Sequence, residues 1–159
     1  MIQRIQTVYY IISMIFLGFL LSGMDLLRFV SKDSYYAFNI HGIAQHFTDS
    51  KLAAVETKSI PLYISVIGLI LLEFVVIMSY KNLNRQFQLA RSIFFLYLLI
   101  LVAFIVFATI GYSPSKSIET TRELGLGFIF LVLGFPFAFL GQISVKRDKK
   151  LLDSLNRLR

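Results

Sequence analysis

The chain has 159 residues, of which 57% are hydrophobic and 16% charged, and its formal net charge is +7. Soluble domains are about 45–50% apolar and about 25% charged, so the composition excludes an ordinary soluble domain and predicts a single-domain integral membrane protein. The absence of cysteine excludes disulfides, thiolate chemistry and cysteine-bound metal or haem.

Four apolar runs predict four transmembrane helices, at residues of about 7–23, 60–80, 92–112 and 124–145. About twenty residues at ~1.5 Å rise per residue match the ~30 Å hydrocarbon core. The first run, Thr7 to Gly23, follows a short basic start, as a secretory signal peptide would. Met24 and Asp25 follow it without a small-x-small cleavage site, so we expect an uncleaved span.

Residues 24–59 form the longest polar segment and predict a small folded cap on the bundle. LLRFVS and YYAFNI flank the turn-like sequence Lys32-Asp33-Ser34, which predicts a short hairpin. The sequence TDSKLAAVE, residues 48–56, predicts a short helix. His41, His46 and Asp49 could be assembled into a metal site, but the histidine spacing is not a helical i, i+4 pair. We therefore expect no metal there.

The second run, IPLYISVIGLILLEFVVIMSY, places one carboxylate, Glu73, deep among apolar residues. A charged carboxylate in hydrocarbon is unfavourable unless it is paired, so we expect Glu73 to be protonated or hydrogen-bonded. In an antiparallel bundle the residues at similar depth include Tyr97, Ser13 and Tyr10. Either Glu73 serves a proton- or cation-coupled site, or it forms a structural interhelical hydrogen bond. We favour the second because no second acidic residue or polar row marks a pathway.

The links between the runs differ in charge. The N-terminus, the second link and the tail carry ten Lys and Arg and two acidic residues, for a net charge of +8. The first and third links carry six of each, for a net charge of zero. The positive-inside rule then predicts that both termini are cytoplasmic. The sum is an all-α membrane protein with four spans, and the positive charge indicates a membrane face rather than a nucleic-acid partner.

The tail, residues 146–159, predicts a basic amphipathic helix with a leucine stripe. Such a helix can lie on the anionic cytoplasmic leaflet, it can dock on a protein partner, or it can be a solvated positive-inside anchor after the last span. The residues that we expect to form this lipid- or partner-binding surface are Arg4, Arg85, Arg91, Lys146, Arg147, Lys149, Lys150, Leu151, Leu155 and Leu158.

No catalytic triad, HExxH sequence, phosphate-binding glycine loop or pair of catalytic carboxylates is present, so we expect neither an enzyme nor a cofactor. The glycines of the fourth run are expected to serve helix packing.

The opening Met1-Ile-Gln-Arg-Ile-Gln-Thr7 and the closing Asp148-x-x-Leu151…Arg157-Leu158-Arg159 resemble a family of small four-span inner-membrane proteins from Bacteroidota, domain-of-unknown-function family 4293. The resemblance implies a bacterial inner membrane, no established activity and a shared role on the cytoplasmic side. Our leading hypothesis is a structural or accessory subunit of a larger membrane complex, in contact with lipids and other membrane proteins. The alternative is a small proton- or cation-coupled transporter or channel that uses Glu73, and it could act as a homo-oligomer.

Overall fold

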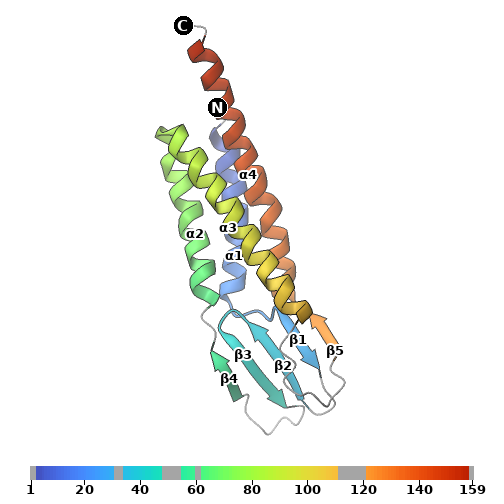
Figure 1. Cartoon of the computed structure of the whole chain (residues 1–159). Helices are drawn as coiled ribbons and strands as arrows, with labels where there is room; N and C mark the ends of the chain where they lie inside the picture. Colours follow the sequence, from blue (N-terminus) through green and yellow to red (C-terminus); the bar gives the residue numbers. More distant parts are fainter. Residues whose placement is uncertain (1–2, 31–33, 48–54, 60–61, 111–120, 158–159) are drawn as a thin grey trace.

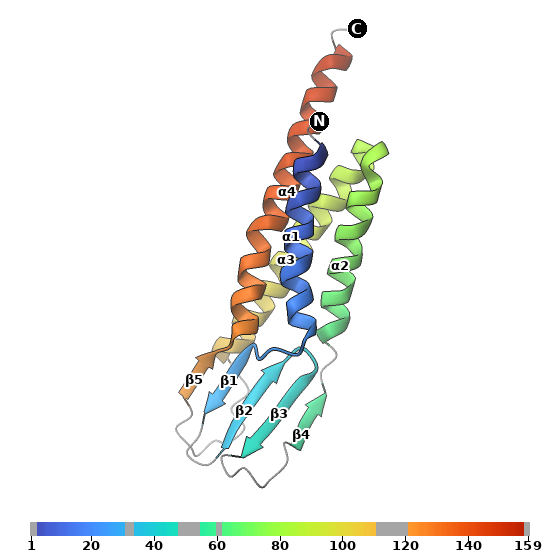
Figure 2. The same cartoon turned by 180° about the vertical axis from the view of Figure 1, so that it is seen from behind.

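Four long helices lie side by side, and a small antiparallel sheet closes one end of the bundle (Figure 1). The computed structural model describes residues 3–30, 34–47, 55–59, 62–110 and 121–157. The helices are α1 (Gln3–Leu21), α2 (Leu62–Met78), α3 (Leu83–Ile110) and α4 (Leu126–Arg157), and a 3₁₀ turn, η1 (Ser79–Lys81), joins α2 to α3. The two chain ends lie at the end of the bundle opposite the sheet (Figure 2). We call the end of the bundle that carries the chain ends the terminal end, and the opposite end the sheet end.

The helices have the length and composition of membrane spans. Three stretches, Leu62–Lys81, Leu83–Val106 and Leu126–Ser154, are long and apolar enough to cross a bilayer, whereas the apolar stretch of α1, Ile5–Leu21, is shorter. Large apolar side chains are exposed along all four helices, among them Ile15, Phe74, Leu99 and Leu133. An exterior of this kind is suited to lipid rather than water. The fold and the composition together describe a membrane protein.

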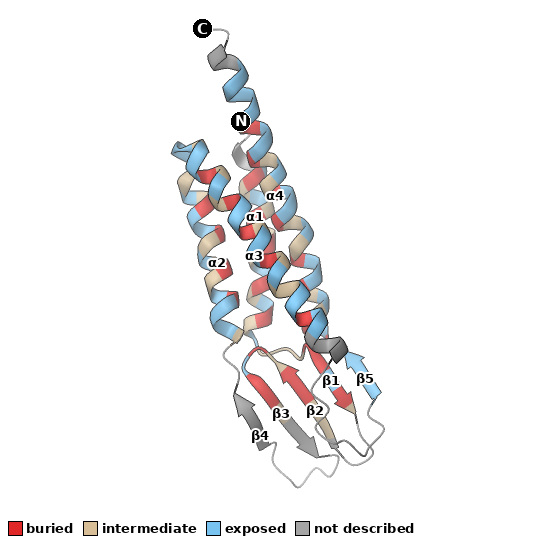
Figure 3. Ribbon diagram, in the orientation of Figure 1, coloured by how far each residue is buried: buried red, intermediate tan, exposed pale blue. Residues whose placement is uncertain are grey.

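Each helix buries one narrow stripe, in which successive buried residues are alternately three and four positions apart, except that Phe104 of α3 follows Tyr97 by seven. This spacing averages 3.5 residues, the repeat that keeps one stripe facing its neighbours in a supercoiled bundle. Figure 3 shows the buried stripes along the helices. We call these residues the heptad seam: Gln6, Tyr10, Ser13, Leu17 and Leu20 of α1; Val66, Leu69, Glu73 and Val76 of α2; Gln86, Ala90, Ile93, Tyr97 and Phe104 of α3; and Gly127, Leu131, Gly134, Ala138, Gly141, Val145 and Asp148 of α4.

Small residues on α4 allow two tyrosines into the seam. A Cβ atom added at Gly141 would lie 2.8 Å from Cζ of Tyr10, and one added at Gly134 would overlap the Tyr97 hydroxyl. Both tyrosines are fully buried. The expectation that the glycines of the fourth run serve packing agrees with these contacts, which are typical of close helix association in membranes.

The sheet has five antiparallel strands in the order β4-β3-β2-β1-β5. Four strands come from the link between α1 and α2, namely β1 (Leu27–Val30), β2 (Ser34–Asn39), β3 (Gly42–Phe47) and β4 (Val55–Ser59). The fifth, β5 (Thr121–Leu124), comes from the link between α3 and α4 and pairs with β1. The sheet therefore ties the two links at this end of the bundle into one unit.

Helix N-termini fasten the sheet to the bundle. The Tyr63 N–H donates to the Ile40 carbonyl over 3.1 Å, and the Gly127 N–H donates to the Asp25 carbonyl over 3.0 Å. The first N–H groups of a helix have no partner within the helix, so these bonds satisfy the starts of α2 and α4. Phe38 of β2 also stacks on Phe104 of α3, with ring centroids 5.8 Å apart.

The structure corrects the sequence predictions in three places. The predicted hairpin exists as β1 and β2, but it belongs to a five-stranded sheet, so the fold is mostly helical rather than all-α. The helix predicted at 48–56 is wrong at its end, where Val55 begins strand β4, and residues 48–54 lie outside the described parts. The expected second link is mostly helix, because α3 begins at Leu83 and its first turns pack on the bundle.

Candidate functional site

Glu73 lies on the seam of α2 with its side chain fully buried. The Ser13 hydroxyl of α1 donates a hydrogen bond to Glu73 Oε1 over 2.7 Å. Glu73 Oε2 has no hydrogen-bond partner among the residues that the structure describes. The arrangement is an interhelical polar contact of the kind that α1 and α2 can form only in one register.

The two tyrosines expected near Glu73 make other contacts. The Tyr97 hydroxyl donates to the Leu131 carbonyl of α4 over 2.9 Å. The Tyr10 ring packs over Gly141, and its hydroxyl has no partner within the described parts of the chain. Of the predicted group of four residues, the structure thus joins Ser13 and Glu73 by a hydrogen bond and places Tyr10 and Tyr97 at seam positions that contact α4.

Three more buried polar side chains occupy seam positions at the terminal end, and the sequence analysis missed all three. Gln6 of α1 donates a hydrogen bond to Oδ2 of Asp148 on α4. Gln86 of α3 donates to the Val76 carbonyl of α2 over 3.2 Å. With Ser13 and Glu73 they form a polar row, which the sequence did not lead us to expect. The sequence does carry a signal that Gln6 is buried. The spacing of Gln6, Tyr10 and Ser13 continues the alternation of four and three residues seen further along α1.

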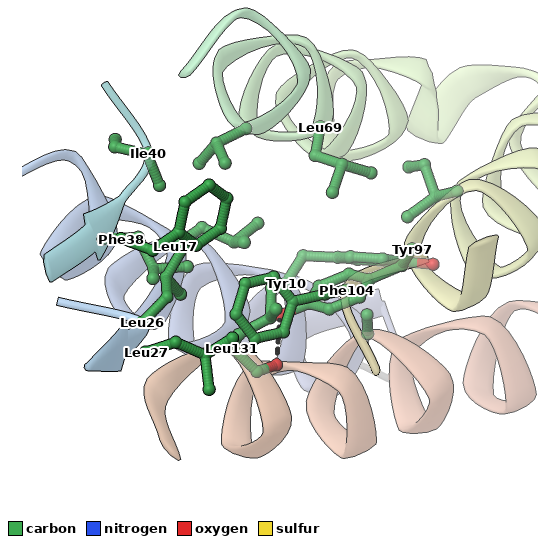
Figure 4. Packing of buried hydrophobic residues seen from close by; sticks show 14 of the residues in the cluster. Tyr10, Leu17, Leu26, Leu27, Phe38, Ile40, Leu69, Tyr97, Phe104 and Leu131 are labelled. Atoms are coloured by element: carbon green, nitrogen blue, oxygen red, sulfur yellow. Dashed lines mark hydrogen bonds between the residues drawn. The ribbon is translucent and has the colours of Figure 1, made fainter. Parts of the chain in front are cut away.

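The polar row ends at Glu73. Between Glu73 and the sheet, the described seam positions carry only apolar side chains: Leu17, Leu20, Val66, Leu69, Phe104 and Leu131. Figure 4 shows several of these side chains, with Phe38 and Ile40, packed between the helices and the sheet. The buried Gln, Ser, Glu and Asp side chains that the structure describes therefore occupy the terminal half of the bundle, and a layer of apolar side chains separates them from the sheet end.

Exposed cations surround the terminal end. Lys81, Arg85, Arg91, Lys146, Arg147 and Lys150 are all exposed. Lys149 is partly buried, with Nζ 4.9 Å from the centroid of the Phe87 ring. Of the other residues predicted for this surface, the side chains of Arg4 and Leu155 and the whole of Leu158 lie outside the described parts.

The basic tail is the last part of α4. The helix continues without interruption to Arg157. It extends beyond the start of α1 and beyond the turn that joins α2 to α3 (Figures 1 and 2). Every described side chain from Lys150 to Ser154 is exposed, including Leu151 at 47% and Leu152 at 41%. We call residues 149–157 the α4 extension. It follows the axis of α4, and its described leucines, Leu151 and Leu152, are exposed.

Of the two histidines in the first link, only His41 has a described side chain. His41 is exposed, and its ring centroid lies 5.7 Å from that of Tyr63. The side chain of His46 and the whole of Asp49 lie outside the described residues. In the parts of the chain that can be described, no group of three or more His, Asp or Glu residues is placed to hold a metal ion.

The residues that carried the family resemblance meet in space, because Gln6 from the opening of the chain binds Asp148 from its close. Among curated proteins, no similar sequence was found. A family model described as domain of unknown function (DUF4293) matches residues 2–158, which is nearly the whole chain. The protein belongs to this family.

Proposed function

We propose that this protein is a four-span protein of the bacterial inner membrane with both termini in the cytoplasm. We further propose that it is a non-enzymatic accessory subunit of a larger membrane complex. The α4 extension is the docking site for the partner. The exposed leucines of this extension, on a helix that leaves the bundle, are the observation that carries the proposal.

The membrane placement is supported by helix length and charge. The 19 residues of α1 give about 28 Å of helix, close to the ~30 Å hydrocarbon core, so α1 is the fourth span beside the three longer ones. Among the described residues, most of the exposed lysines and arginines lie at the terminal end, and Arg28 and Arg122 lie at the sheet end. At the sheet end, Arg28 is paired with Asp25 over 2.8 Å. An excess of lysines and arginines on one side is the pattern of a cytoplasmic face.

The direction of the α4 extension favours a protein partner over the lipid surface. A helix that binds the leaflet lies in the plane of the interface, whereas the extension continues along the axis of a membrane-spanning helix (Figure 1). The extension therefore does not lie flat in the interface. Leu152 also lies seven residues after Val145, so it prolongs the seam beyond the last contact with α1. A helix from another protein can continue the bundle there.

The charge of the extension indicates the chemistry of that partner. Lys149 and Lys150 precede the exposed leucines, and Arg147 lies one turn earlier. Asp153 is the only acidic residue between Lys149 and Arg157. A helix with an apolar stripe and acidic flanks complements this surface, and charge complementarity of this kind sets partner choice and orientation.

The test is purification from native membranes in mild detergent. The wild-type protein is expected to bring down one stoichiometric partner, and increasing salt should weaken the complex. Replacing Leu151 and Leu152 by Ser should remove the partner. Ser154→Ala, on the same extension, should retain it. A monodisperse homomer with no partner, or a partner unaffected by the leucine changes, would refute the docking site.

One observation favours a second candidate function, a proton- or cation-coupled transporter. Glu73 Oε2 and the Tyr10 hydroxyl are buried without partners in the described structure, so the Glu73 carboxyl can take up a proton and both oxygens can ligate a cation. The apolar layer between Glu73 and the sheet argues against a path through a single chain, because a charge would have to cross it unpaired. A flux assay on reconstituted protein tests this candidate function. The wild-type protein should then carry protons or cations across the membrane, and Glu73→Gln should abolish that flux.

A further inference from the structure

An apolar cavity lies where the bundle meets the sheet. Its volume is about 320 Å³, and its floor is formed by the buried side chains of Leu20, Leu26, Phe38 and Leu131. Its wall continues to Ser65 on α2 and to Leu99 and Ala103 on α3, which are all exposed. The cavity thus runs from an open mouth between α2 and α3 to a floor under the sheet. We call it the junction cavity.

The lining narrows the choice of occupant. Ser65 is the one polar residue among the twelve that line the cavity, so a water molecule would lack the two to four polar partners that it needs. An empty cavity is also unfavourable, since the lining atoms lose their packing contacts. An apolar occupant would restore those contacts without leaving a polar group unpaired.

The position of the mouth points to the membrane as the source of the occupant. Ser65 is the fourth residue of α2, so it lies only about 5 Å from the start of the helix. Leu99, on the other side of the mouth, is 63% exposed on a helix long and apolar enough to span a bilayer. A lipid can therefore enter sideways between α2 and α3 while its head group stays near the sheet end, where the spans begin.

We propose that the junction cavity binds one acyl chain of a membrane phospholipid. The proposal rests on the membrane placement proposed above, but not on the partner of the α4 extension. The chain passes between Ser65 and Ala103 and ends against Leu26 and Phe38. Acyl chains are narrow, flexible and wholly apolar, so they match a side pocket of this volume and lining.

Photo-crosslinking in vesicles tests the proposal. The wild-type protein is reconstituted with a phospholipid whose acyl chain carries a diazirine, and the labelled residues are located by mass spectrometry. We expect label on Leu26 and Phe38, which are at most 3% exposed, as well as on the lipid-facing Leu71 and Phe74. Label on Leu71 and Phe74 alone would overturn the cavity proposal and leave the membrane placement intact. Label on neither pair would overturn both.

Two variants and a control test the route. Ala103→Trp at the mouth, and Val66→Phe on the opposite wall, should each remove the label from Leu26 and Phe38. Val102→Trp should leave that label in place, because Val102 is 48% exposed and does not line the cavity. Unchanged labelling of Leu71 and Phe74 verifies that each variant is folded in the membrane. If Leu26 and Phe38 are still labelled in both Ala103→Trp and Val66→Phe, the proposed entry route between α2 and α3 is refuted.

A second probe identifies the source of the chain. A free fatty acid with the same diazirine is compared with the phospholipid at equal concentration in the vesicles. Stronger labelling of Leu26 and Phe38 by the phospholipid than by the fatty acid supports the proposal. Labelling of these residues by the fatty acid alone overturns it.

Discussion

The contact between Gly141 and Tyr10 can be tested by the addition of one methyl group. A Cβ atom at residue 141 would lie 2.8, 2.9 and 3.0 Å from three carbon atoms of the Tyr10 ring. Carbon atoms in good contact are about 3.5–4.0 Å apart, and the fully buried ring has no open space to enter. Gly141→Ala must therefore displace the ring or move α1 away from α4. Overpacking of this kind destabilises a protein by about 1–3 kcal/mol.

Gly68→Ala on α2 is the matched control, because a Cβ atom at Gly68 would meet nothing within 4 Å. Replacing Gly by Ala inside a helix favours the helix by up to about 1 kcal/mol, and this gain is common to both variants. The difference between them isolates the overpacking at Gly141. We expect Gly141→Ala to be less stable than Gly68→Ala by about 1–3 kcal/mol.

The measurement is unfolding in mixed micelles, with helix content followed by circular dichroism while the denaturing detergent is increased. Equal free energies of unfolding for the two variants would refute the close contact. A second background refines the test: Tyr10→Leu removes the ring, so Gly141→Ala should be less harmful when the two changes are combined. An unchanged penalty in that background would place the strain elsewhere on α4.

Two further predictions concern the polar row. Ser13→Ala and Glu73→Met, alone and together, should give a coupling free energy of about 0.5–2 kcal/mol in the same unfolding assay, and a coupling of zero would show that the hydrogen bond does not stabilise the bundle. Gln6→Leu leaves buried Asp148 without its donor, which costs about 1–3 kcal/mol, so amide hydrogen exchange should accelerate in the first turns of α1. Asp148→Asn keeps an acceptor for Gln6 and should exchange more slowly than Gln6→Leu.

The helices could be predicted from the sequence because a bilayer demands about twenty apolar residues per span. The sheet could be predicted only in part. The hairpin of β1 and β2 has apolar and aromatic residues around a turn, whereas β5, with the sequence TREL, is four residues long and fully exposed. A strand of that kind is defined by its pairing with β1, about ninety residues earlier in the chain, and local sequence does not encode that pairing.

The difference between local sequence signals and long-range contacts also explains which site residues could be predicted. Glu73 stood out because it is acidic within an apolar run. Gln6, Gln86 and Asp148 lie in polar sequence beside the apolar runs, where a polar residue is not unusual. Their burial follows from the heptad spacing, in which Asp148 comes seven residues after Gly141, and this period becomes apparent only when the seam is followed beyond the apolar core.

The contacts of the terminal half also determine where the α4 extension points. Gln6 and Asp148 form the last described interhelical hydrogen bond on α4 before the extension begins. The packing of Tyr10 on Gly141 lies two turns earlier on the same helix. We expect a change at either contact to alter the angle at which α4 leaves the bundle, and a small angular change is amplified along the extension, which is about two and a half turns long. The N-terminus and the tail therefore act as one structural unit, which gives a physical reason why the family resemblance lies at both ends of the chain. If the extension docks a partner, Gln6→Leu should weaken that complex although Gln6 lies outside the docking surface.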